Sequence, residues 1–229
     1  MLKDIFDKKY EKILIDEIRD PKTATQKDLA LLESMKDNEI ILNFFKMSRP
    51  SLSMGYNQNE NDPIKENLIK DNVEIFIRET GGTALYFEGK EIVFTICIGK
   101  DVVKDNYFIP SIIHKHVSES LNHAFHKLDI KTNIVEKGSK HTYRPKSCNK
   151  TLSKYELEFD GKKFVSLTCR KIANKMLLNG YFCLEPTYRK ICNFIDDCNA
   201  DNCIIPVSVS EIKNISEEEI KKSIIEEIL

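Results

Sequence analysis

Hydrophobic positions repeat along this chain with two periods, one typical of a helix and the other of strands. Between residues 110 and 128 the apolar side chains recur every three or four positions, which predicts a helix with one apolar face, starting at Pro110. The remaining apolar runs are shorter, and many end near Gly, Pro or Asp, as strands do. The predicted strands cover residues 39–46, 50–56, 73–78, 84–87, 92–99, 131–135, 155–159, 164–170 and 175–184.

The predicted elements do not alternate regularly between strand and helix. Shorter helices are predicted at residues 26–36, 63–70 and 187–196, and residues 1–25 are expected to form a charged arm or helix. Residues 206–229 are expected to form a C-terminal helix, in which Ser216 and Glu219 have the spacing of a capping box. Strands 84–87 and 92–99 are predicted to pair as a hairpin, as are 155–159 and 164–170. We therefore expect one α+β domain over residues 1–229, with a mixed or antiparallel sheet flanked by helices.

Composition narrows the class of protein. The 229 residues include 41% hydrophobic residues, and 35 basic residues balance 36 acidic ones. That balance does not favour a nucleic-acid-binding surface, and no apolar run approaches the roughly 20 residues needed to cross a membrane. The charged start lacks the apolar core of a signal peptide, so we expect a cytoplasmic protein. Seven cysteines without a CxxC pair make a disulfide framework or a metal site unlikely in such a protein.

One cysteine and one lysine are candidates for acyl chemistry. Cys148 lies in a loop rich in positive charge, which increases the thiolate fraction of a cysteine and favours a nucleophile. Lys163 follows the Asp160-Gly161 turn and begins a strand, so that its side chain can point inward and act as a base or a donor. The alternatives are one ordinary cysteine among seven and a solvated hairpin lysine. The basic residues around Cys148 are Lys140, His141, Arg144, Lys146 and Lys150.

Two further patterns are weaker. Thr80, Gly81 and Gly82 follow a predicted strand, and paired glycines let backbone N–H groups approach a ligand, although such turns are common without one. The long helix carries four histidines, at positions 114, 116, 123 and 126. Their spacing does not suit a metal, and a solvated helix face is the better interpretation.

Taken in order, three segments resemble the lipoate/octanoate protein ligase and transferase family, which shares the biotin/lipoate protein ligase catalytic domain. They are PSLSMGYNQN at residues 50–59, RETGGTALYF at 78–87 and ELEFDGKKFVSLTC at 156–169. Cys148 precedes Tyr155 by seven residues, a spacing similar to that of octanoyltransferases with a Cys/Lys pair. The resemblance implies that Cys148 and Lys163 are catalytic, with no metal or cofactor. It also implies substrate contacts from Gly55, Tyr56, Arg78, Thr80, Gly81, Gly82, Ser166 and Gly180.

The chain departs from the family pattern at several motif positions. Ser166 stands where a glycine is usual, and its side chain is expected to narrow the acyl slot. Asn179 stands where many members have histidine. The other departures are Ile77, Thr83, Phe87, Leu167, Thr168 and Cys169.

By this resemblance the protein is expected to be an acyltransferase of protein lipoylation. It would take octanoyl from acyl carrier protein onto Cys148 and pass it to a lysine of a lipoyl-carrier protein, such as the glycine-cleavage H protein. Gly81, Gly82 and Lys163 would hold and polarise the carbonyl. Transfer of octanoyl or lipoyl between two carrier proteins is equally compatible. The alternatives are an ATP-dependent lipoate ligase without its accessory domain, less favoured because about one helix follows Cys203, and a non-catalytic paralogue that binds carrier proteins.

Overall fold

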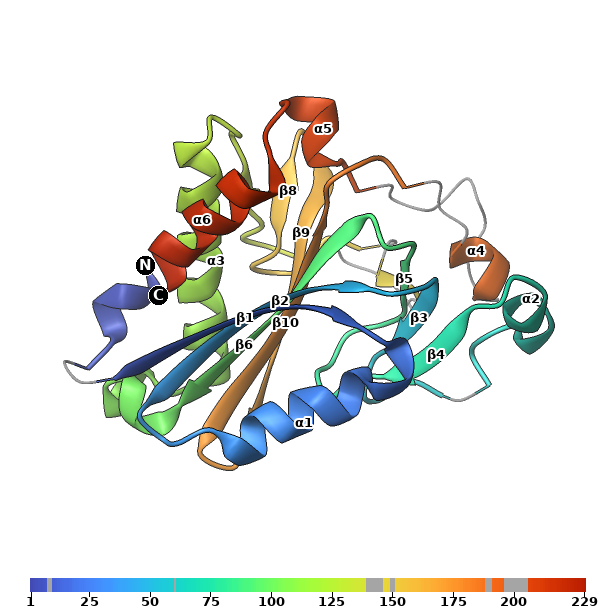
Figure 1. The fold of residues 1–229 in the computed structure, drawn as a ribbon. Coiled ribbons are helices and arrows are strands. Elements are labelled where there is room, and N and C mark those ends of the chain that lie inside the picture. The colour runs from blue at the N-terminus through green and yellow to red at the C-terminus, as the bar shows by residue number, and fades with distance from the viewer. Residues whose placement is uncertain (8–9, 60, 139–145, 149–150, 188–190, 196–205) are drawn as a thin grey trace.

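The computed structural model describes residues 1–7, 10–59, 61–138, 146–148, 151–187, 191–195 and 206–229, which form two sheets and their flanking helices (Figure 1). The large sheet has the order β1-β2-β6-β10-β9-β8-β7, and the small sheet has the order β4-β3-β5. Each sheet contains one parallel pair, β1 with β2 and β3 with β4, among antiparallel ones. The predicted α+β class with a mixed sheet flanked by helices is therefore confirmed.

The large sheet consists of β1 (Glu11–Arg19), β2 (Glu39–Met47), β6 (Glu91–Gly99), β7 (Asn133–Ile134), β8 (Leu157–Phe159), β9 (Lys162–Ile172) and β10 (Lys175–Cys183). The small sheet consists of β3 (Ser51–Met54), β4 (Glu74–Ile77) and β5 (Leu85–Phe87). The α-helices are α1 (Ala24–Ser34), α2 (Lys65–Lys70), α3 (Pro110–Lys127), α4 (Ile191–Phe194), α5 (Val209–Ile212) and α6 (Glu217–Ile228). Short 3₁₀ turns occupy Leu2–Ile5, Pro21–Thr23, Lys100–Val102 and Asp105–Tyr107.

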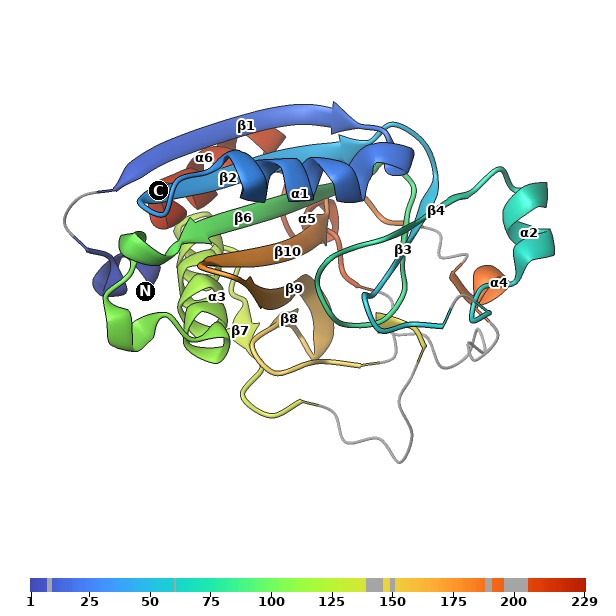
Figure 2. The same ribbon diagram turned by 90° about the horizontal axis from the view of Figure 1, so that it is seen from below.

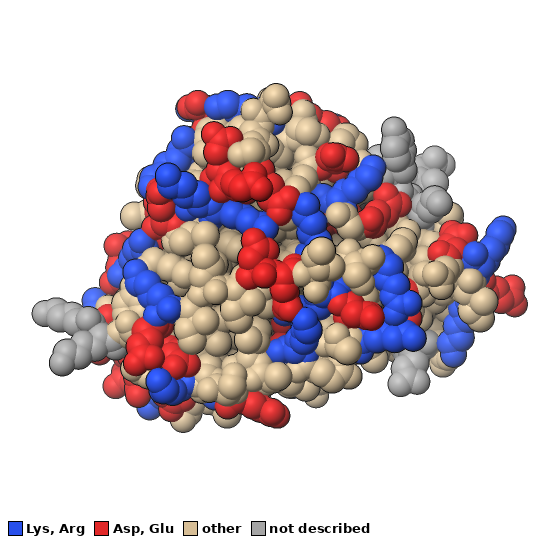
Figure 3. Space-filling model, in the orientation of Figure 1, with Lys and Arg blue, Asp and Glu red and all other residues tan. Residues whose placement is uncertain are grey.

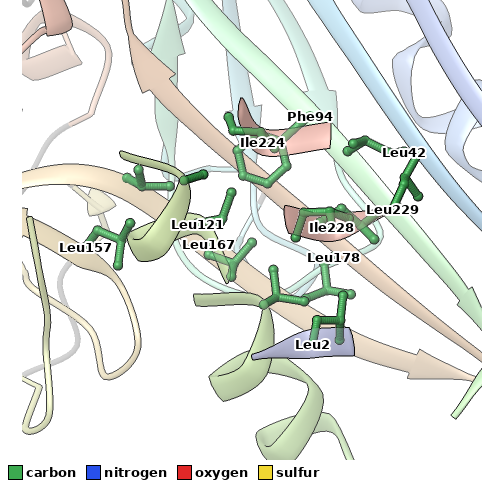
Figure 4. Close-up of a cluster of buried hydrophobic side chains, with 14 of the residues drawn as sticks. Leu2, Leu42, Phe94, Leu121, Leu157, Leu167, Leu178, Ile224, Ile228 and Leu229 are labelled. Atoms are coloured by element: carbon green, nitrogen blue, oxygen red, sulfur yellow. The ribbon is translucent and has the colours of Figure 1, made fainter. Parts of the chain in front are cut away.

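Alternating side chains divide the large sheet between two faces. On β6, Phe94 and Ile96 belong to the main core beneath α3 and α6, whereas Cys97 packs beneath α1 on the opposite face. Figure 2 shows α1 and α3 on opposite sides of this sheet. Part of the main core appears in Figure 4, where Ile224 and Ile228 of α6 approach Phe94 and Leu178. Because both faces are covered, β2 and β6 are apolar almost throughout.

Most of the long predicted elements are confirmed, and their bounds shift by a few residues. Residues 110–128 form α3, 39–46 form β2, 155–159 and 164–170 form the β8–β9 hairpin, and 175–184 form β10. The capping box at the start of α6 is also confirmed, with reciprocal bonds between Ser216 and Glu219. The expected C-terminal helix is shorter than residues 206–229, because α6 begins only at Glu217.

Two predictions are wrong, and both errors concern pairing between strands. Residues 11–19 of the expected arm or helix form β1, an edge strand that pairs in parallel with β2 and turns Ile13 and Ile15 inward. Strands β5 and β6 do not form a hairpin, because β5 pairs with β3 in the small sheet. The link between them is closed by the buried carboxylate of Glu91, which accepts hydrogen bonds from the N–H groups of Glu88, Gly89 and Lys90.

Neither sign of charge dominates the face of the molecule that Figure 3 shows. On the face in Figure 3, Lys and Arg side chains are interspersed with Asp and Glu, in agreement with a net charge of -1. Among the described residues, no helix is long and apolar enough to cross a membrane.

Candidate active site

A cavity of about 230 Å³ lies between α1, the large sheet and the small sheet. Its wall brings together residues that are far apart in the sequence, from Arg19 at the end of β1 to Tyr181 on β10. Six of the ten predicted site residues line it: Arg78, Gly81, Gly82, Cys148, Ser166 and Gly180. Gly55, Tyr56, Thr80 and Lys163 lie outside its wall.

Cys148 is held beside the Thr80-Gly81-Gly82 turn by a short parallel bridge. The N–H of Ala84 donates to the carbonyl of Lys146 at 2.9 Å, and the N–H of Cys148 donates to the carbonyl of Ala84 at 3.0 Å. The sulfur accepts from the N–H and the hydroxyl of Thr83, each at 3.3 Å, and the thiol faces the carbonyl of Thr83 at 3.1 Å. Two donors on the sulfur fix its position and would stabilise negative charge on it. The sequence analysis predicted no role for Thr83 and named it only as a departure from the family motif.

Arg78 adds positive charge beside Cys148. Its guanidinium is only 5% exposed and donates to four neutral oxygens, on Ser53, Gly81 and Thr83, at 2.7–3.2 Å. No ion pair of the described residues includes it, and its Nε is buried without a hydrogen-bond partner. Burial lowers the pKa of Arg78, while attraction to Cys148 opposes that shift. The site therefore contains a buried cation that pairs with no carboxylate of the described residues, and a thiolate or an anionic ligand would compensate its charge.

Glycine is required at positions 55 and 82, where the matched segments 50–59 and 78–87 are in close contact. A Cβ on Gly55 would lie 2.1 Å from the carbonyl oxygen of Gly82. Gly82 has a φ of 90°, and a Cβ there would lie 2.8 Å from the guanidinium of Arg78. Gln58 strengthens this contact, because its side chain accepts from the N–H of Gly55 at 3.0 Å and donates to the carbonyl of Lys146 at 2.8 Å. The glutamine of the first motif thus anchors the segment that carries Cys148.

Lys163 lies outside the cavity and bonds to two residues of its wall, Cys148 and Glu156. It is fully buried, whereas Lys162 is exposed, and its ammonium donates to Glu156 Oε1 at 2.8 Å and to the carbonyl of Cys148 at 3.0 Å. Glu156 Oε1 also accepts from the hydroxyl of Ser166 at 2.7 Å, and Oε2 accepts from the N–H of Ser153 at 2.7 Å. The ion pair with Glu156 suits a charged ammonium rather than a neutral base. The sequence analysis assigned no role to Glu156, although it is the first residue of the matched segment 156–169.

Thr80 and Asn179 tie the glycine turn to the large sheet. The hydroxyl of Thr80 donates to Asn179 Oδ1 at 2.7 Å, and Asn179 Nδ2 donates at 3.0 Å both to Asp28 and to the hydroxyl of Thr95. Asp28 in turn pairs with the fully buried Arg19 at 2.6 Å. This network anchors the turn, so Thr80 supports the cavity without lining it.

The last two predicted residues have different surroundings. Tyr56 is 49% exposed, and the guanidinium of Arg170 lies 3.7 Å from the centre of its ring, outside the cavity. Gly180 faces the main core, where a Cβ would lie 2.3 Å from the ring of Phe94. Glycine at this position is therefore explained by packing in the core.

An apolar cluster forms the part of the cavity next to Cys148. Phe87 and Tyr181 make an edge-to-face contact with ring centres 5.5 Å apart, and Cys148 packs against the cluster. Phe87, which replaces the family's usual histidine, makes this wall apolar. The wall suits a hydrocarbon chain attached at the sulfur. Its apolar members that line the cavity are Ala24, Phe45, Met47, Leu85, Phe87, Val93 and Tyr181.

Two expectations about other candidate residues need correction. His114 is not on a solvated face, because it lines the cavity and its Nε2 atom is buried. Cys192 is disulfide-bonded, against the expectation of unpaired cysteines, whereas Cys198 and Cys203 lie outside the described residues. Burial raises the pKa of Cys97, and it raises that of Cys169 to about 12, so neither thiol is a competing nucleophile. Within the described part of the chain, no group of three or more His, Cys, Asp or Glu residues could hold a metal ion.

Comparison with known proteins gives the family of this chain and relatives of its fold. Residues 20–228 match the family described as the lipoyl protein ligase A/B catalytic domain, and the chain belongs to that family. A sequence comparison with curated proteins found no match.

Solved structures share the fold at low sequence identity. A lipoate-protein ligase A bound with ATP has a TM-score of 0.77 at 14% identity, over 96% of this chain and 83% of that one. A bipartite lipoate protein ligase of Thermoplasma acidophilum, studied with its E2 lipoyl domain, has a TM-score of 0.72 at 14% identity, over 96% and 82% of the two chains. LipL1 of P. falciparum in complex with lipoate has a TM-score of 0.57 at 18% identity, over 94% and 59%. The fold is thus that of the biotin/lipoate ligase catalytic domain.

Proposed function

We propose that residues 1–229 form one catalytic domain that transfers an octanoyl or lipoyl group between carrier proteins through a thioester on Cys148. The family supports lipoylation chemistry in general. The observation that carries the finer assignment is the position of the Cys148 sulfur, between the donors of Thr83 and an apolar cluster.

The first step forms the thioester. The Cys148 sulfur attacks the carbonyl carbon of the donor thioester, and the carbon–sulfur bond to the donor carrier breaks. The donor leaves as a thiolate that takes up the proton lost by Cys148. Arg78 supplies positive charge beside the reacting sulfur, and Lys163 holds the carbonyl of Cys148 so that the sulfur keeps its place.

The second step forms the amide. The amine of a lysine on the acceptor carrier attacks the thioester carbon, the bond to sulfur breaks, and Cys148 is regenerated. The acyl chain lies in the apolar cluster during both steps. A dry cavity of about 150 Å³ accommodates the six carbons of benzene, so by proportion about nine non-hydrogen atoms fit about 230 Å³. An octanoyl group has eight carbons and one oxygen.

An ATP-dependent ligase is the second candidate. The similarity to a lipoate-protein ligase bound with ATP extends over 96% of this chain, and Arg78 is a buried cation without a carboxylate partner in the described ion pairs. In that case Arg78 would face the anionic groups of an acyl-adenylate, and Cys148 would be dispensable. In the T. acidophilum relative, the partner is an E2 lipoyl domain. We propose a lipoyl-carrier domain as acceptor for this chain in either case.

Intact-mass measurement separates the candidates. After incubation with octanoyl-acyl carrier protein, the wild type should gain the mass of one octanoyl group, and Cys148→Ser should gain none. Transfer from the isolated thioester to an apo lipoyl domain should need neither ATP nor Mg²⁺. Modification of the lipoyl domain from free octanoate, with ATP and without Cys148, would establish the ligase instead. Absence of both reactions would favour the non-catalytic paralogue.

A further inference from the structure

His114 is a cavity residue that the reaction described above does not use. It lies near the start of α3, and its ring meets that of Tyr155 edge-on, with centres 5.6 Å apart. The cavity that it lines is also lined by Ser153, Glu156 and Ser166. Its Nε2 atom is buried and has no hydrogen-bond partner among the described residues. An unsatisfied buried polar atom costs about 1–3 kcal/mol, so its presence needs an explanation.

The two carboxylates that line the same wall each accept several hydrogen bonds. Glu156 accepts from Lys163, from Ser166 and from the N–H of Ser153. Asp28 accepts from Arg19, Thr95 and Asn179. A proton acceptor needs a free lone pair, and both carboxylates already accept several hydrogen bonds. None of the described residues donates a hydrogen bond to His114 Nε2.

The protonation state of His114 also suits a proton acceptor. Burial lowers the pKa of His114 from 6.5 to about 4, so the imidazole is neutral at neutral pH. Among the described residues, the cavity wall that contains His114 also contains four charged side chains: Arg19, Arg78, Asp28 and Glu156. The shift is caused by burial of the ring. Negative charge that develops on a reacting carbonyl would favour the protonated imidazole and make proton uptake easier at that moment.

We propose that His114 accepts the proton of the acceptor amine during transfer from the Cys148 thioester, an inference that rests on the proposed function. As the amine nitrogen bonds to the carbonyl carbon, the carbon–sulfur bond breaks and its electron pair stays on the sulfur. The amine proton moves to His114 Nε2. The same proton then passes from the imidazolium to the Cys148 thiolate, which restores the thiol and the neutral imidazole. This leaves Lys163, paired with Glu156, to position the Cys148 segment.

The test separates the two half-reactions. Wild type, His114→Ala, His114→Gln and the control His123→Ala are loaded with octanoyl from octanoyl-acyl carrier protein, and the thioester is counted by intact mass. Each thioester is then mixed with an apo lipoyl domain across a range of pH, with and without added imidazole. His123 lies on the same helix, is 48% exposed at its side chain and pairs with Glu227, away from the cavity.

Both His114 variants should form the thioester as the wild type does and transfer it about 10²–10⁴ times more slowly. Imidazole should restore transfer in His114→Ala, whose vacated space can admit it, and should not change the wild type or His123→Ala. Transfer at the wild-type rate from either variant would overturn the assignment, and so would a slow His114→Ala that imidazole does not rescue. If the wild type forms no thioester, the proposed function itself fails, and the role of His114 fails with it.

Discussion

At the scale of single residues, Lys163 and Lys162 provide a matched pair. Lys163 is fully buried against Glu156 and the carbonyl of Cys148, and Lys162 is exposed on the same strand. We expect Lys163→Ala to abolish acyl transfer and to lower the free energy of unfolding by about 3–5 kcal/mol, because Glu156 is left as an unpaired buried charge. Lys162→Ala should change neither. Denaturant melts and transfer assays measure both effects.

The double variant Lys163→Met with Glu156→Gln tests whether the loss of transfer is more than a loss of stability. It removes both charges and should recover most of the lost stability, since neither side of the ion pair is then left alone. Transfer should stay low, because no ammonium holds the Cys148 carbonyl. Recovery of transfer together with stability would show that Lys163 serves the fold alone.

Ser166 is one of the departures from the family pattern that line the cavity. Its side chain lines the wall, and its hydroxyl donates to Glu156 at 2.7 Å. We expect Ser166→Gly to raise the rate of transfer from eight-carbon donors severalfold, because the slot loses a Cβ and a polar hydroxyl. Rates measured with donors of four to ten carbons should show the largest gain for the longer chains. An unchanged chain-length profile would mean that position 166 does not limit the slot.

At the scale of elements, the accuracy of the sequence predictions depends on whether the stabilising partners are local. The long helix α3 and the β8–β9 hairpin follow from periodicity and a turn, which are properties of adjacent residues. The pairing of β1 with β2 and of β5 with β3 depends on contacts between distant segments, and the sequence predicted neither.

The same distinction applies to the candidate site. The motifs indicated Cys148 and the glycine turn because their residue types are chemically distinctive. Glu156 and His114 acquire their roles only through their neighbours in the folded cavity, and periodicity on α3 gave no sign that one histidine faces inward. The position of Lys163 behind the wall was likewise hidden, because strand alternation predicts an inward direction and not the depth of a side chain.

Helix α6 gives a prediction about an element that lies away from the site. Ser216 and Glu219 form a reciprocal capping box, and Ile220, Ile224 and Ile228 anchor the helix in the main core. We expect Ser216→Ala to lower the free energy of unfolding by about 1 kcal/mol, because it leaves a backbone donor of the first turn unpaired. Ser111→Ala, at an exposed position of α3, should stay within about 0.5 kcal/mol of the wild type. Thioester formation should be normal in both, and a loss of activity in Ser216→Ala would connect α6 to the site.

At the scale of the whole molecule, the cavity joins two sheets that share no strand. Phe45, Val93 and Tyr181 come from the large sheet, whereas Leu85 and Phe87 come from the small one. An acyl chain on Cys148 would fill the space between them and contact both. Occupation of the cavity should therefore stabilise the assembly of the two sheets, in addition to preparing the acyl group for transfer.

We accordingly expect octanoylation of Cys148 to raise the Tm of the whole protein. Each buried CH₂ group contributes about 0.8 kcal/mol, and a gain of even about 2 kcal/mol would raise the Tm of a protein of this size by about 4–8 °C. An acetyl group on the same sulfur should raise it much less, since it buries one methyl. Scanning calorimetry of the purified acylated forms measures the difference, with Cys148→Ser exposed to the same donors as the control. If the octanoylated protein melts no higher than the acetylated one, the chain does not enter the space between the sheets, and the apolar cluster is not the acyl slot.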